Sequence, residues 1–193
     1  MKRNPILDAW LVIALSAGFG SSLAAVQAAL KPRIEANKLC DTLGQVPVLV
    51  TSATRAEKVV VGDRVYYRAL DAAGVTVGWV VPASGQGFAD KIELLIGLDA
   101  TASTITGIYV LDQKETPGLG DNITTEAFRR RFLRKPADVT LSVRKDGAAA
   151  AHEIEAITGA TISSESVVAI VNAALRQFAG QLRSGAIRPG GIP

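Results

Sequence analysis

An uncharged stretch near the N-terminus constrains the fold of this chain more than any other feature. No Asp, Glu, Lys or Arg occurs from Ala9 to Leu30, about 22 residues against the roughly 20 that an α-helix needs to cross a bilayer. A cleaved signal peptide is the alternative, because two basic residues precede the stretch and Val26-Gln27-Ala28 could serve as a cleavage site. The stretch is long for the apolar part of a signal peptide. We therefore expect a tail over residues 1–8 and a retained transmembrane helix over residues 9–30.

Small residues within this stretch, among them Gly18 and Gly20, indicate how the helix meets its neighbours. Small side chains let helices approach closely inside a membrane, so we expect this helix to pack against other membrane subunits. Basic residues flank the stretch on both sides, and charge alone does not set its orientation.

The overall composition indicates a folded domain beyond the helix. Of the 193 residues, 48% are hydrophobic and 20% are charged, which excludes a disordered acidic or basic tail protein. The net charge is only +3, and no long basic run is interleaved with aromatic residues, so nucleic acid is not an expected partner. A local basic cluster at residues 129–135 is interpreted as a solvated helix face, with an interface to an acidic subunit as the second interpretation.

Cysteine and histidine are too few for a metal centre. The chain has one of each, Cys40 and His152. They cannot supply the four cysteines of a typical iron–sulfur cluster or another ligand-rich metal site, so no metal is expected. An organic cofactor must act if this protein carries electrons. The single cysteine cannot form an intramolecular disulfide, which is compatible with an oxidising compartment.

The residues after the membrane stretch predict one α+β domain over residues 31–185, followed by a tail over residues 186–193. We expect a short helix over residues 33–43, which Gly44 and Pro47 end. β-prone residues and turn signals then predict an antiparallel sheet. Its expected strands cover residues 64–70, 75–81, 91–98 and 104–111.

Two helices and one more strand are expected after the sheet. Thr124 or Thr125 caps a helix that buries Phe128 and Phe132, and residues 139–144 return to a strand. The chain then closes with an amphipathic helix that packs on the sheet.

A run of small and hydroxyl-bearing residues precedes the closing helix: Ile157-Thr158-Gly159-Ala160-Thr161-Ile162-Ser163-Ser164. Helical spacing of the following apolar residues makes Ser163 or Ser164 the expected N-cap and places Thr161 just outside the first turn. Unpaired N–H groups and the dipole of a helix N-terminus favour a phosphate there, and Gly159 and Ala160 leave room for a bulky ligand. A phosphate joined to the Thr161 hydroxyl would suit this position. A plain loop with a serine cap is the alternative.

A second motif, Glu115-Thr116-Pro117-Gly118-Leu119-Gly120, predicts a rigid turn. Pro117 fixes its own φ and pushes Thr116 towards extended geometry, while Gly118 permits the positive φ of a type II turn. A purely structural turn is the alternative to a binding role.

These two motifs, with the preceding Leu94-Leu95-Ile96-Gly97-Leu98-Asp99, resemble the FMN-binding domain of the G subunit of the Rnf electron-transport complex. The resemblance spans nearly everything after the N-terminal helix. It implies that FMN is attached through its phosphate to the last threonine of the Ser/Thr-Gly-Ala-Thr motif, which is Thr161 here. It also implies that Thr158, Gly159 and Ala160 shape this site.

The resemblance extends to the rigid turn, where it implies that Thr116 and Leu119 contact the isoalloxazine ring or the ribityl chain. One position departs from the family motif. An aspartate usually stands three residues before the Ser/Thr, where this chain has Glu155, which keeps the carboxylate on a longer arm.

The function that this resemblance implies is a membrane-anchored flavoprotein subunit that relays electrons through covalent FMN. The complex would couple electron flow between ferredoxin and NAD to ion movement across the membrane. Its partners would be the other membrane subunits and the flavin transferase that attaches the FMN. The helix would cross the bacterial inner membrane once, with the soluble domain on the periplasmic side. No catalytic residue is expected in this subunit, and it would not catalyse the reaction alone, because the cofactor carries the chemistry.

Two alternatives stay open at this stage. The C subunit of the sodium-translocating NADH:quinone reductase is a close relative, although the shorter chain and Gly85-Gln86-Gly87-Phe88 favour the Rnf protein. The other alternative is a membrane anchor or assembly module that has kept the fold without the cofactor, which Glu155 leaves open.

Overall fold

The computed structural model describes residues 9–147 and 150–187, and the chain divides into two compact units, Met1–Cys40 and Asp41–Pro193. Helix α2, Trp10–Leu49, begins in the first unit and ends in the second. Its apolar N-terminal part is exposed, and among the described residues it is the one helix long and apolar enough to cross a membrane. This assignment uses only the length and the composition of the helix, and a signal sequence would also be long and apolar enough.

The helix is continuous, and the prediction of a separate helix over residues 33–43 is wrong. Pro32 removes one backbone hydrogen bond, but helix-favouring residues lie near it on both sides, Ala29 and Leu30 before it and Ala36 and Leu39 after it, and the helix continues. Gly44 does not end the helix, and Pro47 lies in its last turn. Burial of Val46 and Leu49 stabilises that last turn, which sequence periodicity did not reveal.

Five antiparallel strands form the sheet of the second unit, in the order β1-β2-β3-β4-β5. All four predicted strands are confirmed, and β3 continues five residues beyond its predicted end, to Gln86. The edge strand β1 was missed because none of its residues is fully buried and only Ala56, Val59 and Val61 are partly buried. The strands are β1 Arg55–Val61, β2 Arg64–Leu70, β3 Thr76–Gln86, β4 Lys91–Asp99 and β5 Ile105–Asp112.

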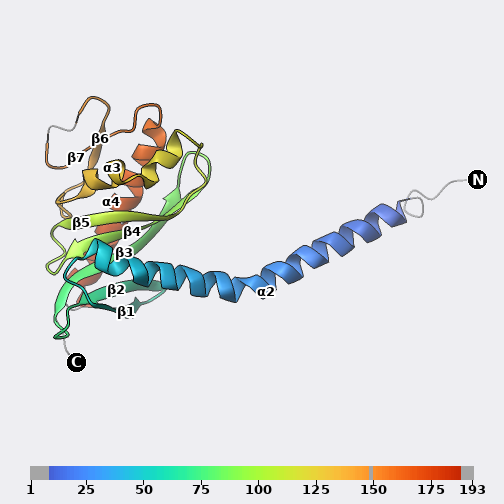
Figure 1. Cartoon of the computed structure of the whole chain (residues 1–193), viewed down its shortest axis with the longest axis horizontal. Helices are drawn as coiled ribbons and strands as arrows, with labels where there is room; N and C mark the ends of the chain where they lie inside the picture. The colour runs from blue at the N-terminus through green and yellow to red at the C-terminus, as the bar shows by residue number, and fades with distance from the viewer. Residues whose placement is uncertain (1–8, 148–149, 188–193) are drawn as a thin grey trace, which may run out of the picture. The chain divides into compact units, whose positions relative to one another are not determined.

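Helix α4, Thr161–Arg183, covers one face of this sheet and packs mainly across β3 (Figure 1). The Phe178 ring lies 5.5 Å from Trp79 and 5.1 Å from Tyr66, measured between ring centroids. Val167 and Val171 join the same buried cluster. The predicted packing of the closing helix on the sheet is therefore confirmed.

The end of α2, within the second unit, covers the opposite face of the sheet (Figure 1). Val46 and Leu49 are buried there with Tyr67, Val80 and Leu95 of the strands. The paired glycines Gly97 and Gly107 lie beneath Leu49, so the helix approaches the strand backbones closely. Apolar side chains thus bury both faces of the sheet, whose middle strand is β3.

Short elements connect β5 to α4. They are the 3-10 helix η1 Gly120–Thr124, helix α3 Glu126–Arg129, the 3-10 helix η2 Arg130–Phe132 and the strands β6 Ser142–Arg144 and β7 Glu153–Glu155. Thr125 caps α3, since its side chain accepts the Phe128 N–H at 3.4 Å, and Phe128 and Phe132 are buried as predicted. The predicted strand over residues 139–144 is confirmed for its last three residues only. It pairs in parallel with β7, which is too short to show a pattern in the sequence.

Candidate functional site

The start of α4 differs from its prediction in one respect. The helix begins at Thr161, and Ala160 occupies the N-cap position without a side-chain cap, so neither Ser163 nor Ser164 is the N-cap. Both serine side chains are buried and bond elsewhere. The Ser164 hydroxyl accepts the Ile157 N–H and donates to the Ala160 carbonyl, each at 3.0 Å. It thereby ties the preceding loop to the helix.

Thr161 consequently lies in the first turn itself, partly exposed. The first N–H groups of a helix have no carbonyl partner within it, and they carry the positive end of the helix dipole. Gly159, with φ of +82°, gives the loop the left-handed turn that brings the chain into the helix.

The rigid turn of the other motif is confirmed. The Leu119 N–H donates to the Thr116 carbonyl at 3.1 Å, and Gly118 has the positive φ, +75°, that a type II turn requires. The Asp121 N–H also reaches the Thr116 carbonyl, at 3.3 Å, which joins the turn to η1.

Both motifs line one cavity of about 440 Å³. Five of the six predicted site residues line it, whereas Thr158 is exposed and lies outside the lining. A cavity of this volume falls within the range of cofactor sites. The lining residues are Phe88, Thr116, Leu119, Gly120, Gly159, Ala160, Thr161, Ile162 and Ser163.

Exposed apolar side chains surround this motif cavity. Phe88, Leu119 and Ile162 are 60%, 46% and 54% exposed, and each comes from a different segment of the chain. In the sequence, Phe88 stood out only as part of a glycine-rich stretch and was not placed in the site. Its signal was an aromatic residue next to Gly87 at the end of a strand, which is ambiguous without the fold.

Glu115 is a second residue that the sequence prediction left out of the site. Its side chain is 4% exposed, and it lies behind the motif cavity. The Ala89 N–H donates to Oε1 at 3.1 Å, and the Ser163 hydroxyl donates to Oε2 at 2.5 Å. The carboxylate therefore joins the start of α4 to the loop that carries Phe88.

That loop, residues 87–90, is closed by a bond from the Gly87 N–H to the Asp90 carbonyl at 2.8 Å. The Asp90 carboxylate accepts the Lys91 N–H and forms a 3.2 Å ion pair with Lys114, which precedes the rigid turn. The Lys91 N–H, followed by Lys114, lowers the pKa of the Asp90 carboxyl below its usual value. Asp90 is thus ionised at neutral pH and available to hold the loop.

Two members of the basic cluster support the segment before Thr158, so the interpretation as a solvated face is wrong for them. Arg131 donates to the carbonyls of Glu155 and Ala156 at 2.6 and 3.0 Å, and Lys135 donates to the Glu153 carbonyl at 2.8 Å. These long side chains reach across to β7, a contact that local sequence could not reveal.

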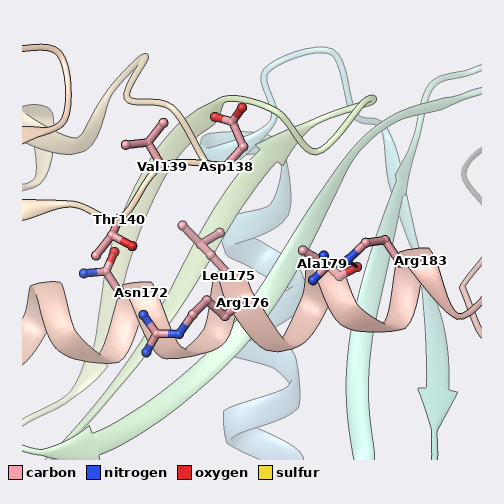
Figure 2. Close-up of a pocket in the computed structure, with 9 residues that line it drawn as sticks. Asp138, Val139, Thr140, Asn172, Leu175, Arg176, Ala179 and Arg183 are labelled. Carbon is pink, nitrogen blue, oxygen red and sulfur yellow. Dashed lines mark hydrogen bonds between the residues drawn. The ribbon is translucent and has the colours of Figure 1, made fainter.

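Another cavity, of about 310 Å³, lies between residues 137–140 and the C-terminal half of α4 (Figure 2). Asn172 borders it and pairs with both backbone groups of Leu141, at 2.9 and 2.8 Å. Asn172 follows Thr161 by eleven residues, about 16 Å of helix, so this cavity is distinct from the motif cavity. Arg176 and Arg183 flank it, and no motif residue lines it (Figure 2).

Acidic, histidine and cysteine side chains do not gather anywhere in the described part of the chain. No group of three or more could hold a metal ion there.

Comparison with known proteins identifies the family to which this chain is similar. Residues 87–176 match the family described as the FMN-binding domain. The chain is 40% identical over 116 residues to the G subunit of the ion-translocating oxidoreductase complex of Methanosarcina acetivorans, covering 60% of this chain and 59% of that protein. It is 38% identical over 130 residues to the G subunit of the proton-translocating ferredoxin:NAD(+) oxidoreductase complex of Clostridium ljungdahlii, covering 67% and 68%. The chain belongs to this G-subunit family. The resemblance to the Rnf G subunit is thereby confirmed.

Residues 87–176, which match the FMN-binding domain, include both motifs. The chain spans 59% and 68% of the lengths of these two relatives. Solved structures show the same fold. Shewanella oneidensis NqrC has a TM-score of 0.58 at 21% identity, covering 69% of this chain and 73% of that one. The C subunit of the Na(+)-translocating NADH-quinone reductase of Parabacteroides distasonis has a TM-score of 0.56 at 23% identity, covering 66% and 76%.

Proposed function

We propose that this chain is a membrane-anchored flavoprotein subunit that relays electrons through one FMN attached covalently to Thr161. It would act within an ion-translocating complex that exchanges electrons between ferredoxin and NAD. The observation that carries the proposal is the convergence of two sequence-distant motifs on one cavity, with the Thr161 hydroxyl at a helix N-terminus.

The residues of the motif cavity fit an FMN. Unpaired N–H groups and the dipole at the start of α4 favour a phosphate beside Thr161. Gly159 and Ala160 leave the wall open to a bulky group. Phe88, Leu119 and Ile162 offer apolar surface to a flat aromatic ring.

Attachment would replace a leaving group on the phosphorus of a flavin nucleotide with the Thr161 oxygen, and the hydroxyl proton would leave with that group. A flavin transferase would catalyse this step, and the partly exposed Thr161 is accessible to it. FMN supplies transfer of one or two electrons when bound. The chain contributes position, an apolar wall and the field of the helix N-terminus, and needs no catalytic acid or base.

The place of the protein in the cell follows the same proposal. The apolar part of α2 would cross the inner membrane once and pack against other subunits of the complex. The FMN-binding domain would lie on the periplasmic side. Relatives matched by sequence are named as G subunits, whereas the solved C subunits, at 21% and 23% identity, share the fold. We therefore favour the G-type complex over the quinone reductase.

Covalent attachment is tested by co-expressing the full chain with a flavin transferase and recording flavin fluorescence after denaturing electrophoresis. The wild-type band should fluoresce, and Thr161→Val should not, because it removes the esterifiable hydroxyl and keeps a similar volume. Thr158→Val is the matched control. It removes a hydroxyl three residues away and outside the cavity lining, so it should reduce attachment without abolishing it.

A fluorescent Thr161→Val band would refute attachment at this residue. A dark wild-type band would favour the cofactor-free anchor module instead.

A further inference from the structure

Glu115 is a deeply buried carboxylate that the proposed electron relay does not use. Its two oxygens accept hydrogen bonds from residues 26 and 48 positions away in the sequence, Ala89 and Ser163. Its own N–H donates to the Gln113 side chain at 2.6 Å, which fixes the backbone from which the carboxylate extends. Three separate segments of the motif cavity therefore meet at one side chain.

The surroundings of Glu115 are built to hold a carboxylate. A Cβ atom on Gly87 would collide with Oε1, and a Cβ atom on Gly120 would lie 2.9 Å from Glu115 Cβ and 2.8 Å from Ser163 Oγ. Glycine at both positions leaves the space that the carboxylate fills. Gly120 and Ser163 also line the motif cavity, so the carboxylate lies directly behind its wall.

Glu115 is a buried polar side chain, so its oxygens need hydrogen-bond donors. A buried carboxylate is unfavourable unless donors satisfy it, and among the described residues its donors are a backbone N–H and a serine hydroxyl. Hydrogen bonds are directional, and the short bond from Ser163 is well suited to fixing geometry. The N-terminus of α4 adds a favourable field, because Ser163 lies in the first turn.

We propose that Glu115 is a positioning residue for flavin attachment. Its carboxylate fixes Ser163, and with it the first turn of α4, against the rigid turn and the loop of residues 87–90. Thr161, two residues before Ser163, is thereby presented to the cavity in one orientation. Glu115 acts through Ser163 and not on the flavin itself. This inference rests on the proposed attachment at Thr161.

The test measures the rate of covalent attachment to the full-length chain, purified without flavin in detergent and mixed with a flavin transferase and its flavin nucleotide. Glu115→Gln keeps the side-chain volume but weakens the bond to Ser163. We expect kcat/KM for attachment to fall about tenfold or more, since small misplacements of a reacting group are costly. Ser163→Ala should fall similarly. The double variant should match the lower single variant within about twofold, because both changes remove one interaction.

Asn172→Ala is the control for a merely structural effect. Asn172 is also a buried polar residue of α4 with two hydrogen bonds, but it lies far from Thr161 along the helix. This variant should lower the thermal midpoint and still attach flavin at the wild-type rate at a temperature where every variant is folded. Glu115→Gln and Ser163→Ala should be slow at that same temperature.

Amide hydrogen exchange of the flavin-free chain gives a readout that does not depend on attachment. Glu115→Gln should speed exchange both near Ala89 and in the first turn of α4, whereas Asn172→Ala should change neither segment. A wild-type chain that acquires no flavin would refute the proposed attachment and, with it, the positioning role; faster exchange in both segments of Glu115→Gln would then show only that the carboxylate fixes the first turn of α4. Wild-type attachment rates in both Glu115→Gln and Ser163→Ala, or unchanged exchange in Glu115→Gln, would overturn the inference.

Discussion

At the residue scale, two glycines in left-handed geometry shape the two halves of the motif cavity. Gly118, with φ of +75°, forms the rigid turn, and Gly159, with φ of +82°, leads into α4. A residue with a Cβ is disfavoured by roughly 1–2 kcal/mol in this region of backbone space. The two positions differ in their surroundings, because a Cβ on Gly159 would lie 3.1 Å from Leu119 Cδ2 and a Cβ on Gly118 would meet nothing within 4 Å.

Alanine substitutions separate these two effects. Both Gly118→Ala and Gly159→Ala should lower the free energy of unfolding by about 1–2 kcal/mol in urea titrations. Gly159→Ala should also reduce flavin binding more than Gly118→Ala does, because its methyl group displaces the Leu119 side chain, which lines the cavity. Equal flavin content in the two variants, measured by absorbance, would argue against a role for Leu119 in the site.

The two motifs in the sequence predicted the residues that line the cavity, but they did not predict the hydrogen bonds that hold it together. Thr116, Leu119 and Thr161 lie in short runs with recognisable turn chemistry, and the structure brings them together. Glu115 was visible only as the first residue of a turn, because its partner Ser163 is 48 residues away. The expected serine cap failed at Ser163 for the same reason, because its hydroxyl donates to Glu115. The Ser164 hydroxyl instead bonds to Ile157 and Ala160 of the adjoining loop.

At the scale of elements, the glycine pair Gly97 and Gly107 lets α2 approach the sheet. A Cβ on Gly97 would lie 2.6 Å from Thr106 Oγ1 and 2.9 Å from Leu49 Cβ, whereas a Cβ on Gly107 would meet only the tip of Leu49 at 3.3 Å. The first contact involves atoms close to the backbone. The second involves the far end of a flexible side chain.

Gly97→Ala should therefore destabilise the domain by about 1–3 kcal/mol, the usual cost of overpacking. Gly107→Ala is its matched control on the neighbouring strand and should change stability by less than about 1 kcal/mol. Urea unfolding followed by tryptophan fluorescence compares the two, since Trp79 is buried in the sheet. If Gly97→Ala were no less stable than Gly107→Ala, the close approach of α2 would not constrain the sheet.

Prediction at this scale succeeded where alternation and turn signals extend over several residues. The four strands from β2 to β5 show both. The edge strand β1 has no fully buried residue, and the three-residue strand β7 is too short for any pattern. The expected strand over residues 139–144 began three residues before β6 does. Helix α2 continues through Pro32 because the residues near the proline favour a helix and because Val46 and Leu49 are buried at its end. Together these effects outweigh the unfavourable helix propensity of one proline.

At the scale of the whole molecule, the boundary between the two units falls within α2, between Cys40 and Asp41. Residues 1–40 contain the apolar stretch, whereas Val46, Leu49 and Val50 belong to the core of the second unit. A deletion that ends at this boundary should therefore remove the anchor and leave the domain intact, whereas a deletion that extends past it should also remove part of the core.

Deleting residues 1–40 should give a domain that remains in solution without detergent and keeps its unfolding midpoint. Deleting residues 1–50 should lower the free energy of unfolding by about 5 kcal/mol or more, because three buried apolar side chains are lost at roughly 1.5–3 kcal/mol each. The full chain should need detergent for extraction and resist high salt and carbonate. Equal stability of the two truncated domains would show that the end of α2 is not part of the core.

The proposed electron relay requires a single FMN joined to Thr161, and an intact mass spectrum of the full chain co-expressed with a flavin transferase detects it. The wild-type protein should be heavier than its sequence by one FMN less one water, and proteolysis should place that mass on the peptide containing Thr161. Thr161→Val should have the mass of its sequence alone. An unmodified wild-type protein, or the added mass on any other peptide, would contradict the account.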